Sequence, residues 1–273
     1  MTEIPDGDAD RAARVHAGDT RRPGFLTFAR RYARHRVAHS LDGLWVAGLE
    51  ETRTALTGRP LIFAANHVAW WDTLLLVVLH EALGGINWAV MDADNLRKLP
   101  FLGWVGALPL DRSSHDSSRQ CLESSAALLD RPGRGLWIFP QGRQRPAHLR
   151  PLDLKRQGLR IIHSRNPIDV VAVSLNYLFL ERNRPAAIVS FSPPLSGAQI
   201  GGEALLSTVE AALLDGLAAI DTAAIAATDG RRASSDPNDP LPGFVPLVRP
   251  SGPALEDGPG AQLLRAYRRR RGD

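Results

Sequence analysis

Short segments that are apolar throughout alternate along this chain with longer segments of helical pattern. The apolar segments, which we expect to be strands, are residues 44–46, 60–65, 86–91, 135–139, 169–175 and 186–191. The expected helices are residues 73–83, 120–129, 152–163 and 205–227. Strands without polar alternation are typical of parallel sheets, because the connecting helices cover both faces. The sequence therefore predicts an α/β fold, a mixed and largely parallel β-sheet flanked by helices.

One strand-to-helix turn carries a His and an Asp at a spacing that suits acid–base chemistry. The strand expected at residues 60–65 leads into Asn66 and His67, and Asp72 follows at the head of the next expected helix. A carboxylate one turn from an imidazole can hold it in one tautomer. It can also stabilise the imidazolium that forms when the ring accepts a proton. The arrangement is typical of a general-base pair.

The spacing by itself leaves two interpretations of this pair open. A second His-x4-Asp match, His148 to Asp153, has no strand before it and contains Pro151, so it lacks the strand–turn–helix setting. On the pattern alone, His67 and Asp72 are either a catalytic pair or a structural His beside a helix-capping Asp.

The composition is that of a globular protein. With 273 residues, 44% hydrophobic and 23% charged, the chain suffices for one large domain or two small ones. We expect no secretory signal in the polar residues 1–24. We also expect no spanning segment, since no uninterrupted apolar run approaches the ~18 residues that a bilayer requires. Cys121 is the single cysteine, which excludes an intrachain disulfide and argues against a Cys-based metal site. We therefore expect no metal, and a reducing compartment.

Arginine supplies most of the positive charge, because Lys98 and Lys155 are the only lysines among 33 basic residues. Six arginines lie within residues 21–36, and five lie within residues 265–271. The forked guanidinium fits phosphate, so we expect an anionic partner, either a membrane surface or a nucleic acid. A solvated basic face in a genome that prefers arginine is the alternative.

Three stretches differ in organisation. Residues 1–23 lack apolar spacing, and we expect a disordered tail. Residues 24–230 are expected to form the folded domain. It would begin with a helix over about residues 25–37 whose aromatic apolar face opposes several arginines. This pattern is typical of an interfacial membrane helix, and equally of a surface helix docked on the core. Residues 231–273 are rich in Pro and Gly and end in the arginine cluster, so we expect a linker and a basic tail.

A glycine-containing stretch precedes Arg112. Gly103 and Gly106 permit tight turns, and a short apolar stretch then delivers Arg112 to a loop. Taken singly, an Asp111–Arg112 salt bridge within the loop is the simpler explanation.

A second loop follows the strand expected at residues 135–139 and reads Phe139-Pro140-Gln141-Gly142-Arg143-Gln144-Arg145-Pro146. Gly142 allows close backbone approach, and Arg143 and Arg145 can clamp a phosphate or a carboxylate. The two prolines limit the freedom of the loop and so lower the entropy lost on binding. A solvated turn is the alternative.

Four blocks in this chain keep a particular order. They are Asn66-His67-x4-Asp72, Gly106-x4-Asp111-Arg112, Phe139-Pro140-x-Gly142, and the Val-rich strand at residues 170–173 that follows Lys155-Arg156-Gln157-Gly158. In this order and spacing the chain resembles the glycerophospholipid acyltransferase family, of which the 1-acylglycerol-3-phosphate acyltransferases are the best known. The resemblance covers about residues 40–195.

The resemblance implies a reaction and a set of roles. His67 would remove the proton from an acceptor hydroxyl that attacks an acyl thioester, and Asp72 would orient His67. Arg112 and the Phe139–Gly142 loop would bind the anionic headgroup of the acceptor. We count Asn66, Arg143, Arg145 and Lys155 with the expected substrate-binding residues. No cofactor is expected, since acyl-CoA or acyl carrier protein brings the acyl group as a co-substrate.

The chain departs from the family in the third block, where members usually read Phe-Pro-Glu-Gly-Thr-Arg-Ser. Here Gln141 replaces the Glu, Arg143 the Thr and Gln144 the Arg, and Arg145 follows one place later. Loss of the carboxylate and movement of the guanidinium put the acceptor in doubt. Lysophosphatidate is the default, and a glycolipid, a carotenoid glycoside or another lipid alcohol is the alternative.

A non-catalytic protein that binds an anionic membrane or a nucleic acid is the alternative from another class. We expect no nucleic acid, because the arginines cluster near the termini and not among aromatic residues on a strand face. The helix over residues 25–37 favours a lipid acceptor reached from the bilayer surface. We therefore expect a cytoplasmic protein attached peripherally to the inner face of the cell membrane.

Overall fold

The computed structural model describes residues 16–165, 168–180, 183–200, 202, 204–230 and 241–251. Its strands are β1 (Leu44–Ala47), β2 (Leu61–Ala65), β3 (Ile86–Asp92), β4 (Ala107–Leu110), β5 (Arg134–Ile138), β6 (Asp169–Phe179), β7 (Pro185–Phe191) and β8 (Val245–Val248). Its helices are α2 (Pro23–Ser40), α3 (Leu49–Gly58), α4 (Asp72–Leu83), α5 (Ala93–Lys98), the 3-10 helix η1 (Pro100–Val105), α6 (His115–Ala126), α7 (Arg156–Arg165) and α8 (Ala204–Gly230).

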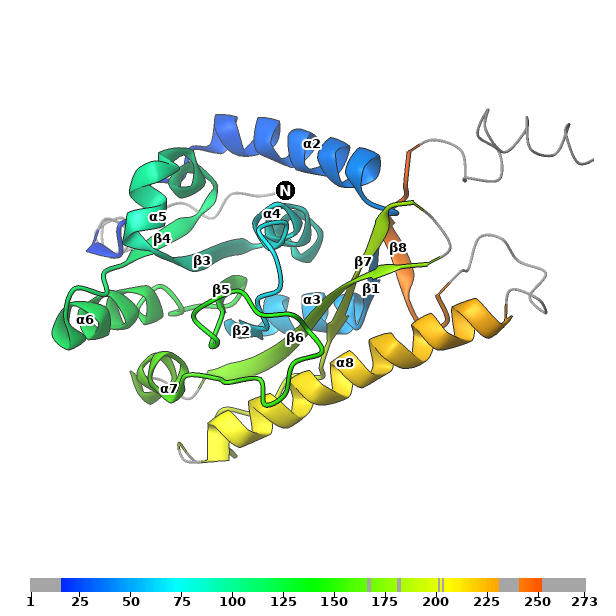
Figure 1. Ribbon diagram of the computed structural model, residues 1–273. Coiled ribbons are helices and arrows are strands. Elements are labelled where there is room, and N and C mark those ends of the chain that lie inside the picture. The colour runs from blue at the N-terminus through cyan, green and yellow to red at the C-terminus, as the bar shows by residue number, and fades with distance from the viewer. Residues whose placement is uncertain are drawn as a thin grey trace, which may run out of the picture.

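The strands form an eight-stranded sheet in the order β4-β3-β5-β2-β6-β7-β1-β8 (Figure 1). The first five strands of that order run parallel, β7 is antiparallel to β6, and β1 is parallel to β7. At the edge, β8 pairs antiparallel with β1. The expected mixed and largely parallel α/β sheet is confirmed.

Alternate side chains of the central strand β2 enter two separate cores. Leu61 and Phe63 pack with α2, α3 and α4 on one face, whereas Ile62 and Ala64 pack with α6, α7 and α8 on the other. Figure 1 shows α2 and α4 above the sheet and α8 along its lower side. All five β2 residues are buried, which explains why this strand is apolar throughout.

The order of the strands places two loops together. β2 lies between β5 and β6 and is parallel to both, so the carboxyl ends of these strands meet at one edge of the sheet. In open α/β sheets, ligands bind outside this edge. The loops after β2 and β5 therefore meet where the sequence places its candidate residues.

The ordered part of the chain begins at an earlier residue than we expected. Ala17 is buried, and Asp19 pairs with Arg21 and accepts a hydrogen bond from Trp88 Nε1 at 3.0 Å. The expectation of a disordered tail up to residue 23 is therefore wrong for residues 16–22, because these polar residues find partners in the core that composition does not reveal. Residues 1–15 lie outside the described part of the chain.

Part of the expected linker is also ordered. Leu241 and Phe244 are buried, and β8 extends the sheet. Pro246 lies in this strand, where an edge position tolerates the missing N–H. Because prolines are rare in strands, this proline-containing stretch was not predicted as one. Residues 231–240 and 252–273, which include the C-terminal arginine cluster, lie outside the described residues.

Helix α8 is long and strongly apolar. Among the described residues it is long and apolar enough to cross a membrane by length and composition, with a candidate span at Ala204–Thr228. We expected no such segment, because acidic residues interrupt the apolar run of this helix. A buried stripe nevertheless runs along the helix, and Ser174 Oγ of β6 donates to Leu213 O at 2.8 Å. These contacts are those of a helix that covers a sheet.

Several shorter elements were not predicted, namely α3, α5, η1, β4 and β8. The helix expected from residue 152 begins only at Arg156, because residues 152–155 form part of the loop that approaches the candidate site.

Candidate active site

His67 and Asp72 meet directly after β2. His67 Nδ1 lies 2.7 Å from Asp72 Oδ2, which also accepts hydrogen bonds from Val68 N at 2.8 Å and Ala69 N at 3.2 Å. The Tyr177 hydroxyl donates to Asp72 Oδ1 at 2.6 Å. Asp72 is 1% exposed, so its charge is compensated by these donors and not by water. An ionised Asp72 requires the proton on His67 Nδ1, which leaves Nε2 as the accepting nitrogen.

Asp72 orients the imidazole but does not cap α4. It is the first residue of that helix, and its carboxylate accepts from two backbone amides of the turn before the helix and from His67. The side chain therefore orders the turn that carries His67, and the expected helix cap is not formed.

Asn66 ties this loop to the neighbouring strand β6. Its Nδ2 donates to Leu175 O at 2.9 Å, and its Oδ1 accepts from Leu175 N at 2.7 Å. Asn66 is buried and does not line the cavity described below. This expected substrate-binding residue instead links the His67 loop to β6, because its amide oxygen and one amide N–H both bond to the backbone of Leu175.

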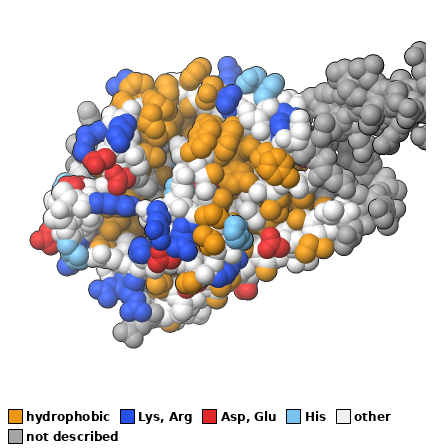
Figure 2. Space-filling model, viewed as in Figure 1, with side chains coloured by type: hydrophobic (Ala, Val, Ile, Leu, Met, Phe, Trp, Pro, Cys, Tyr) orange, Lys and Arg blue, Asp and Glu red, His pale blue; other side chains and the backbone are white. Residues whose placement is uncertain are grey.

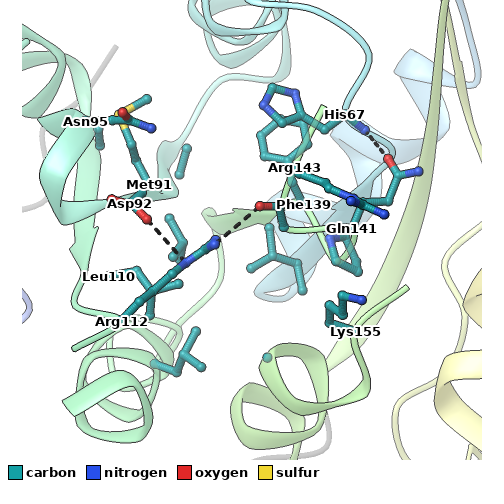
Figure 3. A pocket seen from close by; sticks show the side chains of 18 of the residues that line it. His67, Met91, Asp92, Asn95, Leu110, Arg112, Phe139, Gln141, Arg143 and Lys155 are labelled. Atoms are coloured by element: carbon teal, nitrogen blue, oxygen red, sulfur yellow. Dashed lines mark hydrogen bonds and ion pairs between the residues drawn. The ribbon is translucent and has the colours of Figure 1, made fainter. Parts of the chain in front are cut away.

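Gln141 links the loop after β5 to the His67 turn (Figure 3). Its Oε1 accepts from His67 N at 2.7 Å, and its Nε2 donates to Leu152 O at 2.9 Å. Gln141 is 3% exposed, so it does not present its amide to solvent. An amide satisfies both contacts, whereas a carboxylate at this position can only accept. The ring of Phe139 lies 4.5 Å from the His67 ring, centroid to centroid, and covers one side of it.

A cavity of about 1180 Å³ opens beside His67. This exceeds the ~300–1,000 Å³ of ordinary small-ligand pockets, so there is room for a long ligand. One wall is largely apolar and comes from α4, β3, η1 and β4, with Leu76, Val77, Val90, Leu102, Val105 and Leu110. The other wall is polar and comes from the loops after β4 and β5 and from the first residue of α6, with Arg112, Ser114, His115, Gln141, Arg143 and Lys155.

Arg112 bridges the two sides of the polar wall. Its Nε lies 3.4 Å from Asp92 Oδ2, and its NH1 donates to Gly142 O at 3.3 Å (Figure 3). Lys155 N donates to Pro140 O at 2.7 Å, which brings Lys155 to the same loop. The expected Asp111–Arg112 salt bridge is replaced by the contact with Asp92.

Asp153 forms ion pairs with three further cations beside this wall. Its Oδ2 lies 3.0 Å from Arg143 NH2 and 3.0 Å from Arg145 NH1, and its Oδ1 lies 3.1 Å from Lys155 Nζ. Arg143 and Lys155 line the cavity, whereas Arg145 does not. Arg145 is largely buried and donates to Pro151 O, so its side chain stabilises the loop and does not face the cavity.

The model of the family described as Acyltransferase matches residues 44–182 of this chain. The chain belongs to the acyltransferase family. A 1-acyl-sn-glycerol-3-phosphate acyltransferase from Saccharomyces cerevisiae is 28% identical over 152 residues, which cover 52% of this chain and 49% of the yeast protein. The chain thus spans about half the length of the curated relative it matches. The resemblance to glycerophospholipid acyltransferases that the four blocks indicated is confirmed.

Sequence reasoning missed Tyr177, which completes the surroundings of the pair in this acyltransferase. Burial, together with the nearby Asp72 charge, raises the pKa of Tyr177 far above its usual range, so its hydroxyl stays protonated and donates. The expected strand ended at residue 175, but β6 continues to Phe179 and carries Tyr177 to the His67 loop. A tyrosine two residues after a candidate core strand was the available signal.

His80 was also missed. It lies two turns beyond Asp72 on α4 and lines the apolar wall. Burial, with smaller effects from Arg21 and Arg30, lowers the pKa of His80 to about 3, so the ring is neutral at pH 7. Its Nε2 has no hydrogen-bond partner among the described residues. A neutral imidazole suits an apolar wall, and no charge faces the cavity there.

Among the residues that the structure describes, no group of three or more His, Cys, Asp or Glu side chains is arranged to hold a metal ion.

Proposed function

We propose that the protein is an O-acyltransferase that moves a fatty acyl group from an acyl thioester to a hydroxyl of a lipid acceptor. The observation that carries this proposal is the pairing of His67 Nδ1 with the buried Asp72 carboxylate at 2.7 Å, beside a large cavity with one apolar wall. Membership of the acyltransferase family supports acyl transfer as the reaction.

The chemistry follows from the free nitrogen of His67. Nε2 accepts the proton of the acceptor hydroxyl while the hydroxyl oxygen attacks the thioester carbonyl carbon. The carbon–sulfur bond then breaks, and the proton on His67 passes to the departing thiolate. Asp72 holds the ring and stabilises the transient imidazolium. The donor is acyl-CoA or acyl carrier protein, and its acyl chain lies against the apolar wall.

The acceptor to test first is lysophosphatidate, in phospholipid synthesis, because the name of the yeast relative specifies it. Arg112, Arg143 and Lys155 line the cavity and supply cations for a headgroup. Glycolipid, carotenoid glycoside and other lipid alcohols remain acceptors in the same reaction class.

A panel of these acceptors with radiolabelled acyl-CoA tests the proposal. We expect a labelled ester product with at least one lipid alcohol, and no product when the acceptor is omitted. Failure of every acceptor, with both acyl-CoA and acyl carrier protein as donors, would contradict acyl transfer. If the protein instead shifts duplex DNA and does not pellet with liposomes, the non-catalytic binding alternative is favoured.

We propose that the enzyme lies in the cytoplasm and is held peripherally on the inner face of the cell membrane, chiefly by α2. Ala33 and Val37 of this helix pack on the core, whereas Phe28 is 61% and Tyr32 is 48% exposed. α2 thus docks on the core by one stripe and leaves an aromatic stripe free. Figure 2 shows hydrophobic side chains gathered on the upper and central part of the face in view, with basic side chains beside and below them.

This attachment predicts partial release by salt and further release when the aromatic stripe is removed. Each surface arginine contributes about 1 kcal/mol on an anionic leaflet, and high salt removes that part. Phe28→Ser with Tyr32→Ser should lower binding to anionic vesicles at both low and high salt, because the apolar part is insensitive to salt. Vesicle co-sedimentation measures this, with Ile225→Ser on α8, 62% exposed, as the matched control. Equal retention of all three proteins would contradict docking by α2.

A further inference from the structure

One carboxylate forms ion pairs with three cations at the polar wall of the cavity. Asp153 is in contact with Arg143, Arg145 and Lys155 at 3.0 to 3.1 Å. Two of these cations, Arg143 and Lys155, line the cavity directly. Arg112 is the other cation that lines this wall, and its Nε lies 3.4 Å from Asp92 Oδ2. Each cation on the polar wall therefore already faces an anion of the chain itself.

The backbone holds Asp153 in place for this contact. Its φ of 59° is the one positive value among the described residues other than glycine. Asp and Asn adopt this region more readily than other residues with a Cβ. The Lys155 hydrogen bond, with smaller contributions from Arg143 and Arg145, lowers the pKa of Asp153 below its usual value, so the side chain is ionised at neutral pH.

The position of this charge has a direct consequence for the headgroup. A phosphate monoester that approaches Arg143 and Lys155 meets the Asp153 carboxylate on the same two cations. Like charges a few ångströms apart repel, and the phosphate must share or displace the existing ion pairs. A headgroup with uncharged hydroxyls meets no such repulsion, because hydroxyls donate to a carboxylate and accept from guanidinium or ammonium groups.

Resting on the proposed acyl transfer, we infer that Asp153, which does not itself line the cavity, is a specificity-determining residue because it already pairs with two cations that do. It favours lipid acceptors with uncharged, hydroxyl-bearing headgroups over phosphate monoesters. This refines the lysophosphatidate default, and it assigns the choice to the charge that the chain places among its cations.

The test is the ratio of kcat/KM for lysophosphatidate to kcat/KM for a monoacylated glycosylglycerol, measured with one acyl-CoA in the same detergent micelles. Asp153→Asn and Asp153→Gly remove the charge with residues that tolerate the positive φ. We expect the ratio to rise by about threefold to tenfold in both variants, because one solvent-screened like charge beside the phosphate is gone. Glu50→Gln, which removes a carboxylate from an exposed Glu50–Arg53 pair on α3, is the control and should leave the ratio unchanged.

A ratio that changes by less than about twofold in both Asp153 variants would overturn the inference while leaving acyl transfer intact. An inactive wild-type protein would instead overturn the proposed function. For that case, or for inactive variants, glycerol 3-phosphate binding by titration calorimetry decides independently of turnover. Tighter binding by Asp153→Asn than by wild type supports the inference, and equal binding contradicts it.

Discussion

The loop that carries His67 and the loop that carries Asp153 border the same cavity but are held in different ways. In the first, the Asp72 carboxylate is 1% exposed and accepts from an imidazole, two backbone amides and a phenol. In the second, Asp153 is about one-third exposed, and its partners Arg143 and Lys155 are each more than 60% exposed.

In the proposed function, this difference separates the loop of the chemistry from the loop that selects the acceptor. Buried hydrogen bonds in a low dielectric hold one geometry and are costly to break. Exposed ion pairs contribute little to stability and weaken with salt. With the proposed roles, we expect a few substitutions in the second loop to change the preferred headgroup and a single substitution in the first to remove the reaction.

The largest effect that would test this contrast comes from Asp72→Asn. Oδ2 of Asp72 faces both backbone amides and His67 Nδ1. An amide that keeps its oxygen there loses the charge that stabilises the imidazolium, and an amide that turns its N–H there favours the wrong tautomer. We expect turnover to fall by about 10²–10⁴-fold with every acceptor, with little change in fold. Steady-state kinetics measure the loss, and His148→Ala, at an exposed His, is the control that should retain activity. Retention of turnover by Asp72→Asn would remove the orienting role.

A smaller loss is expected from Gln141→Glu, which restores the residue usual in the family. The buried carboxylate would face the carbonyl of Leu152, to which Gln141 now donates at 2.9 Å. Leaving that acceptor unsatisfied costs ~1–3 kcal/mol, so we expect lower thermal stability and about tenfold lower turnover with all acceptors alike. If Gln141→Glu changes only the preference among acceptors, then Gln141 belongs with the selective loop and not with the catalytic one.

The smallest effect should come from Arg112→Ala on the polar wall. Arg112 is 50% exposed and makes two contacts longer than 3.2 Å, so its removal should not disturb the fold. We expect the KM for the acceptor to rise by roughly fivefold to tenfold, with kcat nearly unchanged and the KM for acyl-CoA less affected. This effect should shrink at high salt, as for other exposed charges. A loss confined to kcat would instead place Arg112 in the chemistry.

The same contrast explains what the sequence allowed us to predict. Buried strands and the helix after His67 leave apolar patterns, so the sheet, α4 and the His67–Asp72 pair were all predictable. Contacts between distant segments leave no such pattern. Tyr177 reaches Asp72 over 105 positions, and Asn66 reaches Leu175 over 109, so their roles required the fold.

The polar wall was predicted as a set of residues but not as an arrangement. Arg143, Arg145 and Lys155 were expected to face a ligand, yet all three turn to Asp153, which the pattern had assigned to a chance match with His148. A charge pattern in a loop does not specify which ion pairs form. Likewise, residues 16–22 and 241–251 acquire order only from partners elsewhere in the chain.

The central claim is that His67 is the general base of this acyltransferase, and kcat of His67→Ala tests it most directly. The account predicts a fall of about 10²–10⁴-fold with lysophosphatidate and with an uncharged acceptor alike, with the near-ultraviolet circular dichroism of the wild type. Near wild-type turnover by a His67→Ala protein with a native spectrum would contradict the account.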